Sequence, residues 1–482
     1  MPATPPTPPA SPALTPRFVT GSLMRHVTVM AGTGAVGLFA VFAVDLINLF
    51  YISLLGHQEI AAAVGFAGVV GFFHVSVAIG LTIGITAVVA RAIGAGQTVD
   101  ARRLATASLT LMVAITAVVG SGTALFLGPA LQALGASGEV AQLAQRYLAV
   151  TVHSLPLLGM GMACAALLRA VGDARRAMVV TLAAALVTAV LDPILIFGFK
   201  LGLDGAAIAS VVSRVVLAAV GLHGVLVRHR MLSRLDLSRF KADAKTLMAV
   251  ATPAILTNLA TPVAAAFVTH SIAQFGPFAV AGAAIIDRVS PVAFGVIYAL
   301  SGAVGPILSQ NLGAGRVDRV REGLRASLVF MACAVALAWV LLALAVVPWG
   351  GGQGLLIRMF SADAAAAELI TLFCLGLAPS FFFIGALFVA NAAFNNLGHP
   401  LLSTAFNWGR ATLGTIPFAW WGSHYSASGV LIGQSVGSAI FGLLAMVVAW
   451  RITGRLKGKA PEPTGGEVVP AAAAATHSAS AG

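Results

Sequence analysis

Charged side chains are scarce in this chain. Asp, Glu, Lys and Arg together make up 9% of its 482 residues, whereas 59% of the residues are hydrophobic. A soluble domain carries roughly 25% charged residues, so the charged residues here could not cover a water-facing surface. This scarcity excludes a soluble protein and indicates that lipid surrounds most of the chain.

Cysteine is also scarce, and catalytic or metal-binding motifs are missing. Cys164, Cys333 and Cys374 each lie singly inside an apolar stretch. That spacing fits neither a metal site nor a disulfide framework, and it is typical of small packing residues. The sequence also lacks a nucleophile motif and a pair of catalytic carboxylates on one loop. We therefore expect neither enzyme activity nor a cofactor.

Long apolar stretches, in contrast, recur from residue 28 to residue 450. A membrane-spanning helix needs about 20 apolar residues, so we predict an all-α polytopic membrane protein with twelve transmembrane helices. Their approximate positions are 28–55, 60–90, 104–128, 146–168, 177–199, 205–227, 247–274, 279–311, 326–349, 364–394, 401–421 and 428–450.

The net charge of +12 does not indicate a nucleic-acid partner, because the basic residues form no single face. They lie in short loops, where Lys and Arg set the orientation of membrane helices. Basic loops alternate with loops that have almost no charge. The basic segments are 91–103, 169–176, 228–245, 316–325 and 451–459. This alternation predicts a multi-pass protein of the bacterial inner membrane with both termini in the cytoplasm.

An internal repeat predicts two lobes of six helices each. Ala92–Gly96, followed by Arg102, matches Asn311–Gly315, followed by Arg321, at an offset of 219 residues (313 − 94 and 321 − 102). Because each half has an even number of spans, both halves enter the membrane in the same orientation. A pseudo-twofold axis along the membrane normal then relates them.

A second, shorter match of the repeat relates Gly172-Asp173 to Gly398-His399 at an offset of 226 (398 − 172). The repeat and the composition together predict five regions. These are a disordered Pro-rich tail at 1–20, an N-lobe at 21–228, a cytoplasmic linker at 229–245, a C-lobe at 246–456 and a disordered tail at 457–482.

Several short motifs follow one another along the chain: Leu55-Gly56 with 60–65, Gly94–Gly96, Leu168–Asp173, Leu191–Pro193 with Gly205–Ser210, and Gly305–Arg316. In this order they resemble the multidrug and toxic compound extrusion (MATE) family, in particular its DinF-like bacterial branch. The resemblance covers about residues 25–455. It implies a monomeric exporter of small organic, often cationic compounds, driven by exchange for H+ or Na+.

Two acidic residues lie well inside predicted spans, Asp45 in the first and Asp192 in the fifth. An ionised carboxylate at the bilayer centre costs about 2.5–3.5 kcal/mol, so such a group stays protonated or binds a cation. Pro193 removes a helical N–H, and Thr188 lies one turn before Asp192. A carboxylate, a hydroxyl and a freed carbonyl can therefore converge on a cation. A hydrogen bond to a neighbouring helix for packing alone is the alternative.

The resemblance implies further roles in the first lobe. In the family, the fifth-span Asp has an Asn one turn before it and a Thr eighteen positions after it. Here these positions are Thr188 and Ser210. Asp192 is then a candidate Na+ ligand, with H+ coupling at least as well supported because the Asn amide is missing.

The first-span Asp of the family corresponds to Asn48, and Asp45 lies one turn earlier. We predict that both line the first-lobe cavity and that Asp45 supplies the charge.

Aromatic and amide side chains complete the predicted substrate cavity. Aromatic rings can hold planar cations through apolar and cation–π contacts, although packing or lipid contact is the alternative for each ring. The predicted cavity residues are Phe50, Tyr51, Asn258, Phe388 and Asn391.

A flippase for a lipid-linked precursor is the alternative function. It is disfavoured because only twelve spans are visible and few cationic residues lie inside them. Those residues are Arg214, Arg288 and Arg410.

Overall fold

The structure is a computed structural model, and it describes residues 14–54, 58–348 and 353–456. All regular elements in these ranges are helices. Ten of them are long and apolar enough to cross a membrane, and the bent pair α10 and α11 forms an eleventh span. A twelfth span, 400–423, runs through α16, a π-helical segment and α17.

The helices follow one another with short connections. The first half contains α1 (Leu23–Leu54), α2 (Gln58–Gly94), α3 (Thr98–Leu125), α4 (Leu127–Ala133), α5 (Gly138–Thr151), α6 (Leu155–Ala170), α7 (Ala174–Pro193) and α8 (Gly202–Leu222). The second half contains α9 (Leu237–Ala273), α10 (Pro277–Ala293), α11 (Gly295–Gly313), α12 (Val317–Val346), α13 (Leu355–Met359), α14 (Ala364–Leu372), α15 (Phe381–Asn396), α16 (Pro400–Gly409), α17 (Ile416–Ser423) and α18 (Ala427–Arg455).

Several spans are bent or locally widened next to a proline. The 47° bend between α10 and α11 follows Pro291, which lacks the N–H that the helix needs. The π-helical segment Ile194–Gly198 follows Pro193 at the end of α7, and the segment Arg410–Thr415 precedes Pro417. These irregular turns are where backbone groups of the membrane interior leave the regular helical pattern.

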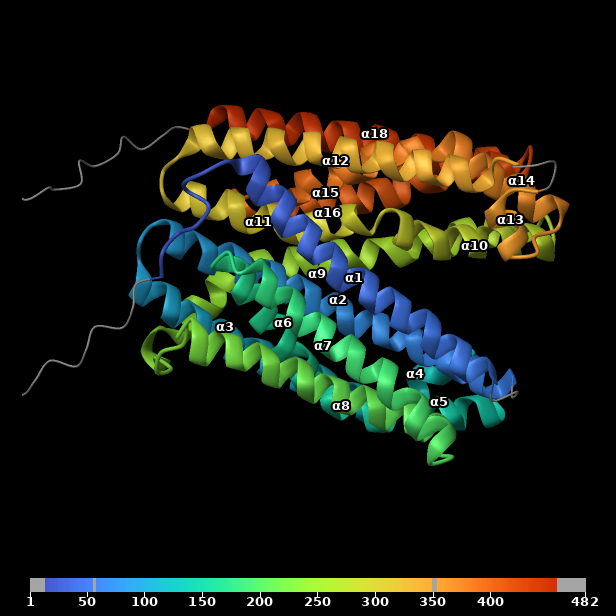
Figure 1. Cartoon of the computed structure of the whole chain (residues 1–482), viewed down its shortest axis with the longest axis horizontal. Coiled ribbons are helices and arrows are strands. Elements are labelled where there is room, and N and C mark those ends of the chain that lie inside the picture. The colour runs from blue at the N-terminus through green and yellow to red at the C-terminus, as the bar shows by residue number, and fades with distance from the viewer. Residues whose placement is uncertain (1–13, 55–57, 349–352, 457–482) are drawn as a thin grey trace, which may run out of the picture.

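The helices form two bundles (Figure 1). The N-lobe, α1–α8, is drawn in blue to green, and the C-lobe, α9–α18, in yellow-green to red. The bundles meet near the end where the chain termini lie, and they diverge toward the other end. Residue Leu237, where α9 begins, lies inside the segment 229–245 that was predicted as the linker.

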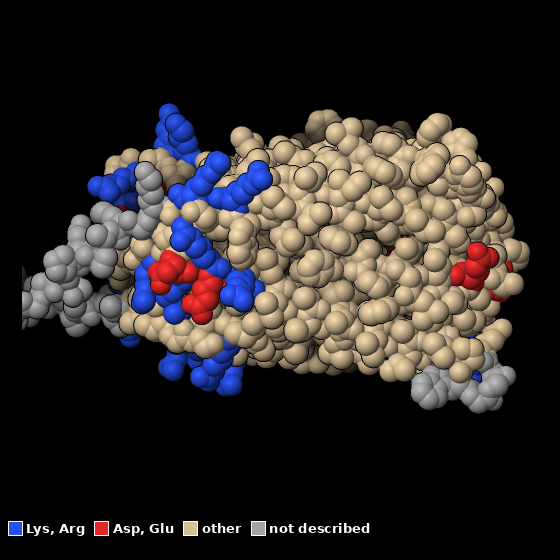
Figure 2. Space-filling view, turned by 90° about the horizontal axis from the view of Figure 1, so that it is seen from above, with Lys and Arg blue, Asp and Glu red and all other residues tan. Residues whose placement is uncertain are grey.

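Lys and Arg gather at one end of the molecule, whereas the broad middle is almost bare of charge (Figure 2). We call this end, where α2, α6, α11 and α15 finish, the basic end. An uncharged belt between polar ends is the surface that a lipid bilayer requires.

Two glycines of the internal repeat bring the lobes into contact at the basic end. A Cβ added to Gly94 would lie 2.0 Å from the carbonyl oxygen of Gln310, and one added to Gly313 would lie 2.1 Å from that of Arg91. Arg91 and Gln310 are themselves related by the repeat offset of 219 (310 − 91). The contact is therefore reciprocal, as a pseudo-twofold axis between the lobes requires.

Residues 14–20, part of the predicted disordered tail, make defined contacts with both lobes. Leu14 packs into the N-lobe core, and Phe18 packs into the C-lobe core. The Phe18 N–H donates to Gln310 Oε1 (3.0 Å), while Gln310 Nε2 donates to the Ala170 carbonyl (2.6 Å). The free energy gained by burying these two apolar side chains outweighs the conformational entropy lost when the short segment 14–20 becomes ordered. We call this segment the strap. Residues 1–13 and the predicted tail 457–482 lie outside the described residues.

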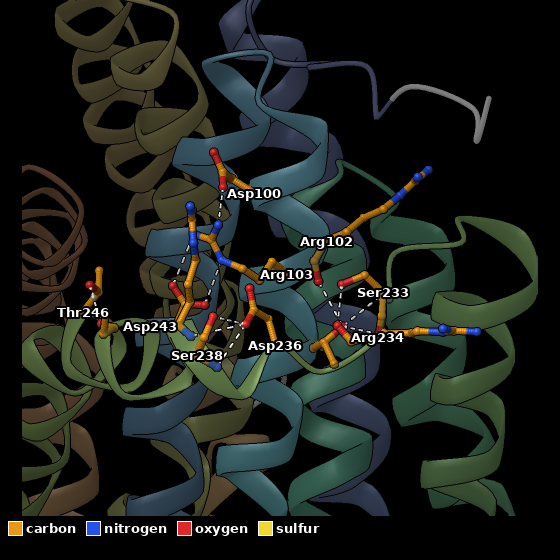
Figure 3. A network of polar contacts seen from close by, with 12 residues as sticks. Asp100, Arg102, Arg103, Ser233, Arg234, Asp236, Ser238, Asp243 and Thr246 are labelled. Carbon is orange, nitrogen blue, oxygen red and sulfur yellow. Dashed lines mark hydrogen bonds and ion pairs between the residues drawn. The ribbon is translucent and has the colours of Figure 1, made fainter. Parts of the chain in front are cut away.

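A polar network also fixes the start of the C-lobe to α3 (Figure 3). Arg103 donates to both carboxylate oxygens of Asp243, at 2.9 and 3.3 Å, and to Asp100 at 2.5 Å. Nearby, the Ser233 N–H donates to Thr106 Oγ1 at 2.9 Å. These bonds fasten the connection between the two lobes to the N-lobe.

Candidate cation and substrate site

Asp192 is the best-buried carboxylate inside a span. It is 1% exposed and lies in the last turn of α7, next to Pro193. Neither of its carboxylate oxygens has a hydrogen-bond partner among the described residues. A buried acceptor without a donor is costly, so this group is suited to bind a cation or to carry a proton.

Asn48 on α1 and Asp192 on α7 follow a contact between these two helices by the same number of residues. The two helices pack against each other, and a Cβ on Gly37 would lie 3.5 Å from Thr181 Cβ. Asn48 follows Gly37 by eleven residues (48 − 37), as Asp192 follows Thr181 (192 − 181). Eleven residues are close to three full turns, so Asn48 and Asp192 lie on the same faces of their helices as Gly37 and Thr181.

The amide oxygen of Asn48 is a third unpartnered acceptor on these two helices. Asn48 Oδ1 is buried and has no hydrogen-bond partner within the described ranges. Together with the two oxygens of Asp192 it forms a set of buried acceptors on two facing helices. Such a set is what a Na+ ion or a shared proton would satisfy.

The other predicted coupling residues lie near this pair but bond elsewhere. Thr188 Oγ1 donates to the Ala184 carbonyl at 3.2 Å, and Ser210 is 3.5 Å from the Tyr147 hydroxyl. Asp45 lies on α1, one turn before Asn48, and is exposed. Asn48 is half-buried, and its amide oxygen is fully buried.

In the N-lobe, aromatic rings extend from this site toward the diverging end. Tyr51 contacts Phe197 of the π-helical segment after α7, with ring centroids 5.8 Å apart. Phe50 lies beside Tyr51, at a centroid distance of 6.2 Å, and is 58% exposed. Tyr51 therefore lies about one turn after Asn48, whereas Phe50, two residues after Asn48, lies on another face of α1.

In the C-lobe, the predicted cavity residues have local partners. Phe388 contacts the ring of Tyr298 at 5.5 Å. Asn258 Nδ2 donates to the Ala254 carbonyl at 2.8 Å, within its own helix. Asn391 is 6% exposed, and its Oδ1 accepts a hydrogen bond from Asn407 at 3.0 Å.

A small cavity with several polar side chains in its lining, not predicted from the sequence, lies on the seam between the lobes. Its volume is about 40 Å³. The lining residues come from α2, α6, α11 and α15 and are Thr82, Ile83, Thr86, Arg169, Ser301, Gly302, Gly305, Pro306, Ala392, Asn395 and Asn396. A larger cavity, of about 470 Å³, lies between α14 and α18, away from both sites. The described residues contain no group of three or more His, Cys, Asp or Glu that could hold a metal ion.

The MatE family model matches residues 35–194 and 253–421, one segment in each lobe and more than half of the chain in all. The chain belongs to the MatE family. This result confirms the resemblance to MATE proteins, and it makes the chain a multi-pass membrane transporter rather than an enzyme.

Relatives cover almost the whole chain. A FAD transporter of Shewanella oneidensis is 31% identical over 425 residues, which cover 86% of this chain and 92% of that protein. The multidrug export protein MepA of Staphylococcus haemolyticus is 22% identical, covering 85% and 90%.

Solved structures share the fold. The MATE transporter VcmN of Vibrio cholerae, as a mutant, superimposes with a TM-score of 0.83 at 26% identity, covering 89% of this chain and 96% of that one. A multidrug resistance MATE transporter in an outward-facing conformation gives a TM-score of 0.84 at 21% identity, covering 91% and 98%. The predicted twelve-helix fold is thereby confirmed.

Proposed function

We propose that this MATE transporter exports small organic compounds across the bacterial inner membrane in exchange for H+ or Na+, with the cation bound in the N-lobe at Asp192. The observation that supports this proposal is the set of three unpartnered acceptors, Asp192 Oδ1, Asp192 Oδ2 and Asn48 Oδ1. The printed names of the relatives, a FAD transporter and a multidrug export protein, favour small organic substrates.

The orientation follows from the charge distribution. Lys and Arg lie at the basic end, which the positive-inside rule assigns to the cytoplasm. Both chain termini then lie in the cytoplasm, and the lobes are closed on that side. Exchange by a monomer would proceed as the lobes rock about the seam and alternately open each side.

The two facing helices give a way to couple the cation to this motion. A cation between Asn48 and Asp192 would draw α1 toward α7, because it supplies the partner that both side chains lack. Removal of the cation leaves buried acceptors facing each other, which favours separation of the helices. Since α1 also packs against α11 of the C-lobe, movement of α1 is transmitted across the seam.

Proteoliposomes with separately imposed proton and sodium gradients test this function. We expect Asp192→Asn to abolish gradient-driven transport of ethidium and of FAD, because the amide lacks the negative charge and the titratable proton of the carboxyl group. Asp204→Asn is the matched control, since Asp204 forms an ion pair with exposed Arg146. Gradient-driven transport by Asp192→Asn at the wild-type rate would refute the role of this carboxylate.

Asp45→Asn and Asn48→Leu distinguish the two first-helix candidates. The buried amide oxygen of Asn48 predicts that Asn48→Leu impairs coupling, whereas the sequence predicts that Asp45 supplies the charge. Loss of coupling in Asp45→Asn alone would favour the interpretation from the sequence.

A further inference from the structure

The cavity on the seam lies between residues that the internal repeat relates to each other. Thr82 corresponds to Ser301 at the offset of 219 (301 − 82), and Arg169 corresponds to Asn395 at the offset of 226 (395 − 169). All four line the cavity. The cavity therefore lies on the pseudo-twofold axis, and a substrate that passes between the lobes would cross this point.

Arg169 makes the cavity asymmetric. Its Nε is buried without a hydrogen-bond partner, and its guanidinium forms no hydrogen bond or ion pair within the described residues. Two other arginines, in contrast, donate to carbonyl groups: Arg91 donates to Asn396 O at 2.6 Å, and Arg214 donates to Thr151 O at 2.6 Å. The positive charge of Arg169 is thus available to a ligand.

The polar groups around Arg169 offer donors. Asn395 uses its oxygen to accept from Ser403 at 3.1 Å, which leaves its NH2 group for a ligand. Ser301 has no hydrogen-bond partner among the residues that the structure describes. The hydroxyls of Thr82 and Thr86 already donate to backbone carbonyls.

No carboxylate from the described part of the chain lines this space. An unpartnered guanidinium with nearby N–H and O–H donors suits an anion and repels a cation.

Space for the anion comes from a glycine. Gly302 occupies the position that corresponds to Ile83 (302 − 83), and a Cβ there would already lie 3.8 Å from Arg169 Nε. The volume of about 40 Å³ compares with roughly 10–15 Å³ that one water needs. A single anionic group fits, whereas a whole drug molecule does not.

We infer that this cavity, formed by Arg169, Asn395 and Ser301, is a subsite for the phosphate group of an organic phosphate substrate. The inference rests on the proposed export function and specifies its substrate class. Opening of the contact between Gly94 and Gly313 would expose the subsite to the cytoplasm, so that it captures the anionic group before the lobes close. The phosphate could belong to a soluble nucleotide-like compound or to a lipid headgroup.

Transport by the full chain in proteoliposomes tests the subsite with four probes. These are FAD, riboflavin (the same ring system without phosphates), ethidium, and a fluorescently labelled phospholipid. We expect Arg169→Met to raise the KM for FAD roughly tenfold or more, with riboflavin and ethidium little changed. Arg169→Lys should recover part of the FAD transport, because it retains the charge.

Two further variants separate recognition from folding. Asn395→Asp should reproduce the FAD defect, since its carboxylate would pair with Arg169 and occupy the subsite. Arg175→Met, which removes an exposed charge at the same end, should behave as wild type. Arg169-dependent movement of the labelled lipid without FAD transport would retain the subsite and assign its phosphate to a headgroup.

Two results would overturn the inference. One is an equal loss of FAD and ethidium transport in Arg169→Met, which would indicate a structural role. The other is FAD transport by Arg169→Met at the wild-type KM. Either result is distinct from failure of the proposed function, in which the wild-type protein would move no probe in response to a cation gradient.

Discussion

The reciprocal glycine contact predicts that one methyl group will open the basic end. In Gly94→Ala, the new Cβ would lie 2.0 Å from the Gln310 carbonyl oxygen, where ordinary contact begins at 3.4 Å. The helices would have to separate by about 1.4 Å (3.4 − 2.0). Overpacking of this kind costs about 1–3 kcal/mol, which shifts a conformational equilibrium about 5–150-fold.

The control for this substitution lies on the same helix. Gly71 of α2 has nothing within 4 Å of an added Cβ, so Gly71→Ala should leave the lobes in place and favour the helix slightly. Gly313→Ala should act like Gly94→Ala, because its Cβ would lie 2.1 Å from the Arg91 carbonyl oxygen. The double variant should cost less than the sum, since the first substitution already separates the helices.

Spin labels across the basic end measure the opening. Val99→Cys on α3 and Asp318→Cys on α12 are exposed positions on opposite lobes. Cys333 is exposed and needs replacement by Ala, whereas Cys164 and Cys374 are buried. We expect a longer or broader distance distribution in Gly94→Ala and an unchanged one in Gly71→Ala. Identical distributions in both variants would refute the idea that this contact holds the lobes together.

Two further predictions concern the same end of the molecule. Phe18→Ala should favour the open basic end and lower the melting temperature, because loss of a buried Phe costs about 3–5 kcal/mol. The exposed Thr20→Ala is its control, and unchanged label distances would contradict the role of the strap. Burial raises the pKa of Asp173, but hydrogen bonds from His229 and Arg176 outweigh it and hold that pKa below the usual range. Stability from Asp173 is therefore present above about pH 4 and lost as the pH falls below it. Melting in detergent from acid to neutral pH should show a weaker acid dependence for Asp173→Asn than for wild type, and equal dependence would refute this.

The repeat and the buried carboxylate could be predicted from the sequence because both follow from local patterns. Gly94 and Gly313 have the same neighbours in sequence, and Asp192 is conspicuous in an apolar span. The packing of α1 against α7 could not be predicted, because it depends on which helices pack together and in what register. For the same reason, the sequence shows neither the exposure of Asp45 nor the burial of the Asn48 amide oxygen.

Two features were missed although their residues are visible. Arg169 lies within a segment that carries the family resemblance, but a sequence does not show whether an arginine meets a carbonyl or an empty cavity. Phe18 lies in a segment rich in proline, and only the apolar pair Phe18-Val19 distinguishes it from a disordered tail. In both cases the decisive contact comes from the other lobe, more than a hundred residues away.

The two lobes are related by a repeat, but the charged residues Asp192 and Arg169 of the N-lobe have no charged counterpart at the corresponding positions of the C-lobe. Asp192 precedes Pro193 in the fifth span of the N-lobe, whereas Ile416 precedes Pro417 in the fifth span of the C-lobe; Arg169 is matched by Asn395. In the proposed exchange, a cation at Asp192 would therefore act on the N-lobe alone, because the corresponding position of the C-lobe holds no carboxylate. If the substrate is an organic phosphate, entry of a cation and exit of the anion both carry positive charge inward. The membrane potential then contributes about 2.3 kcal/mol per charge for each 100 mV, in addition to the cation gradient, so export of an anion needs less of that gradient than export of a cationic drug.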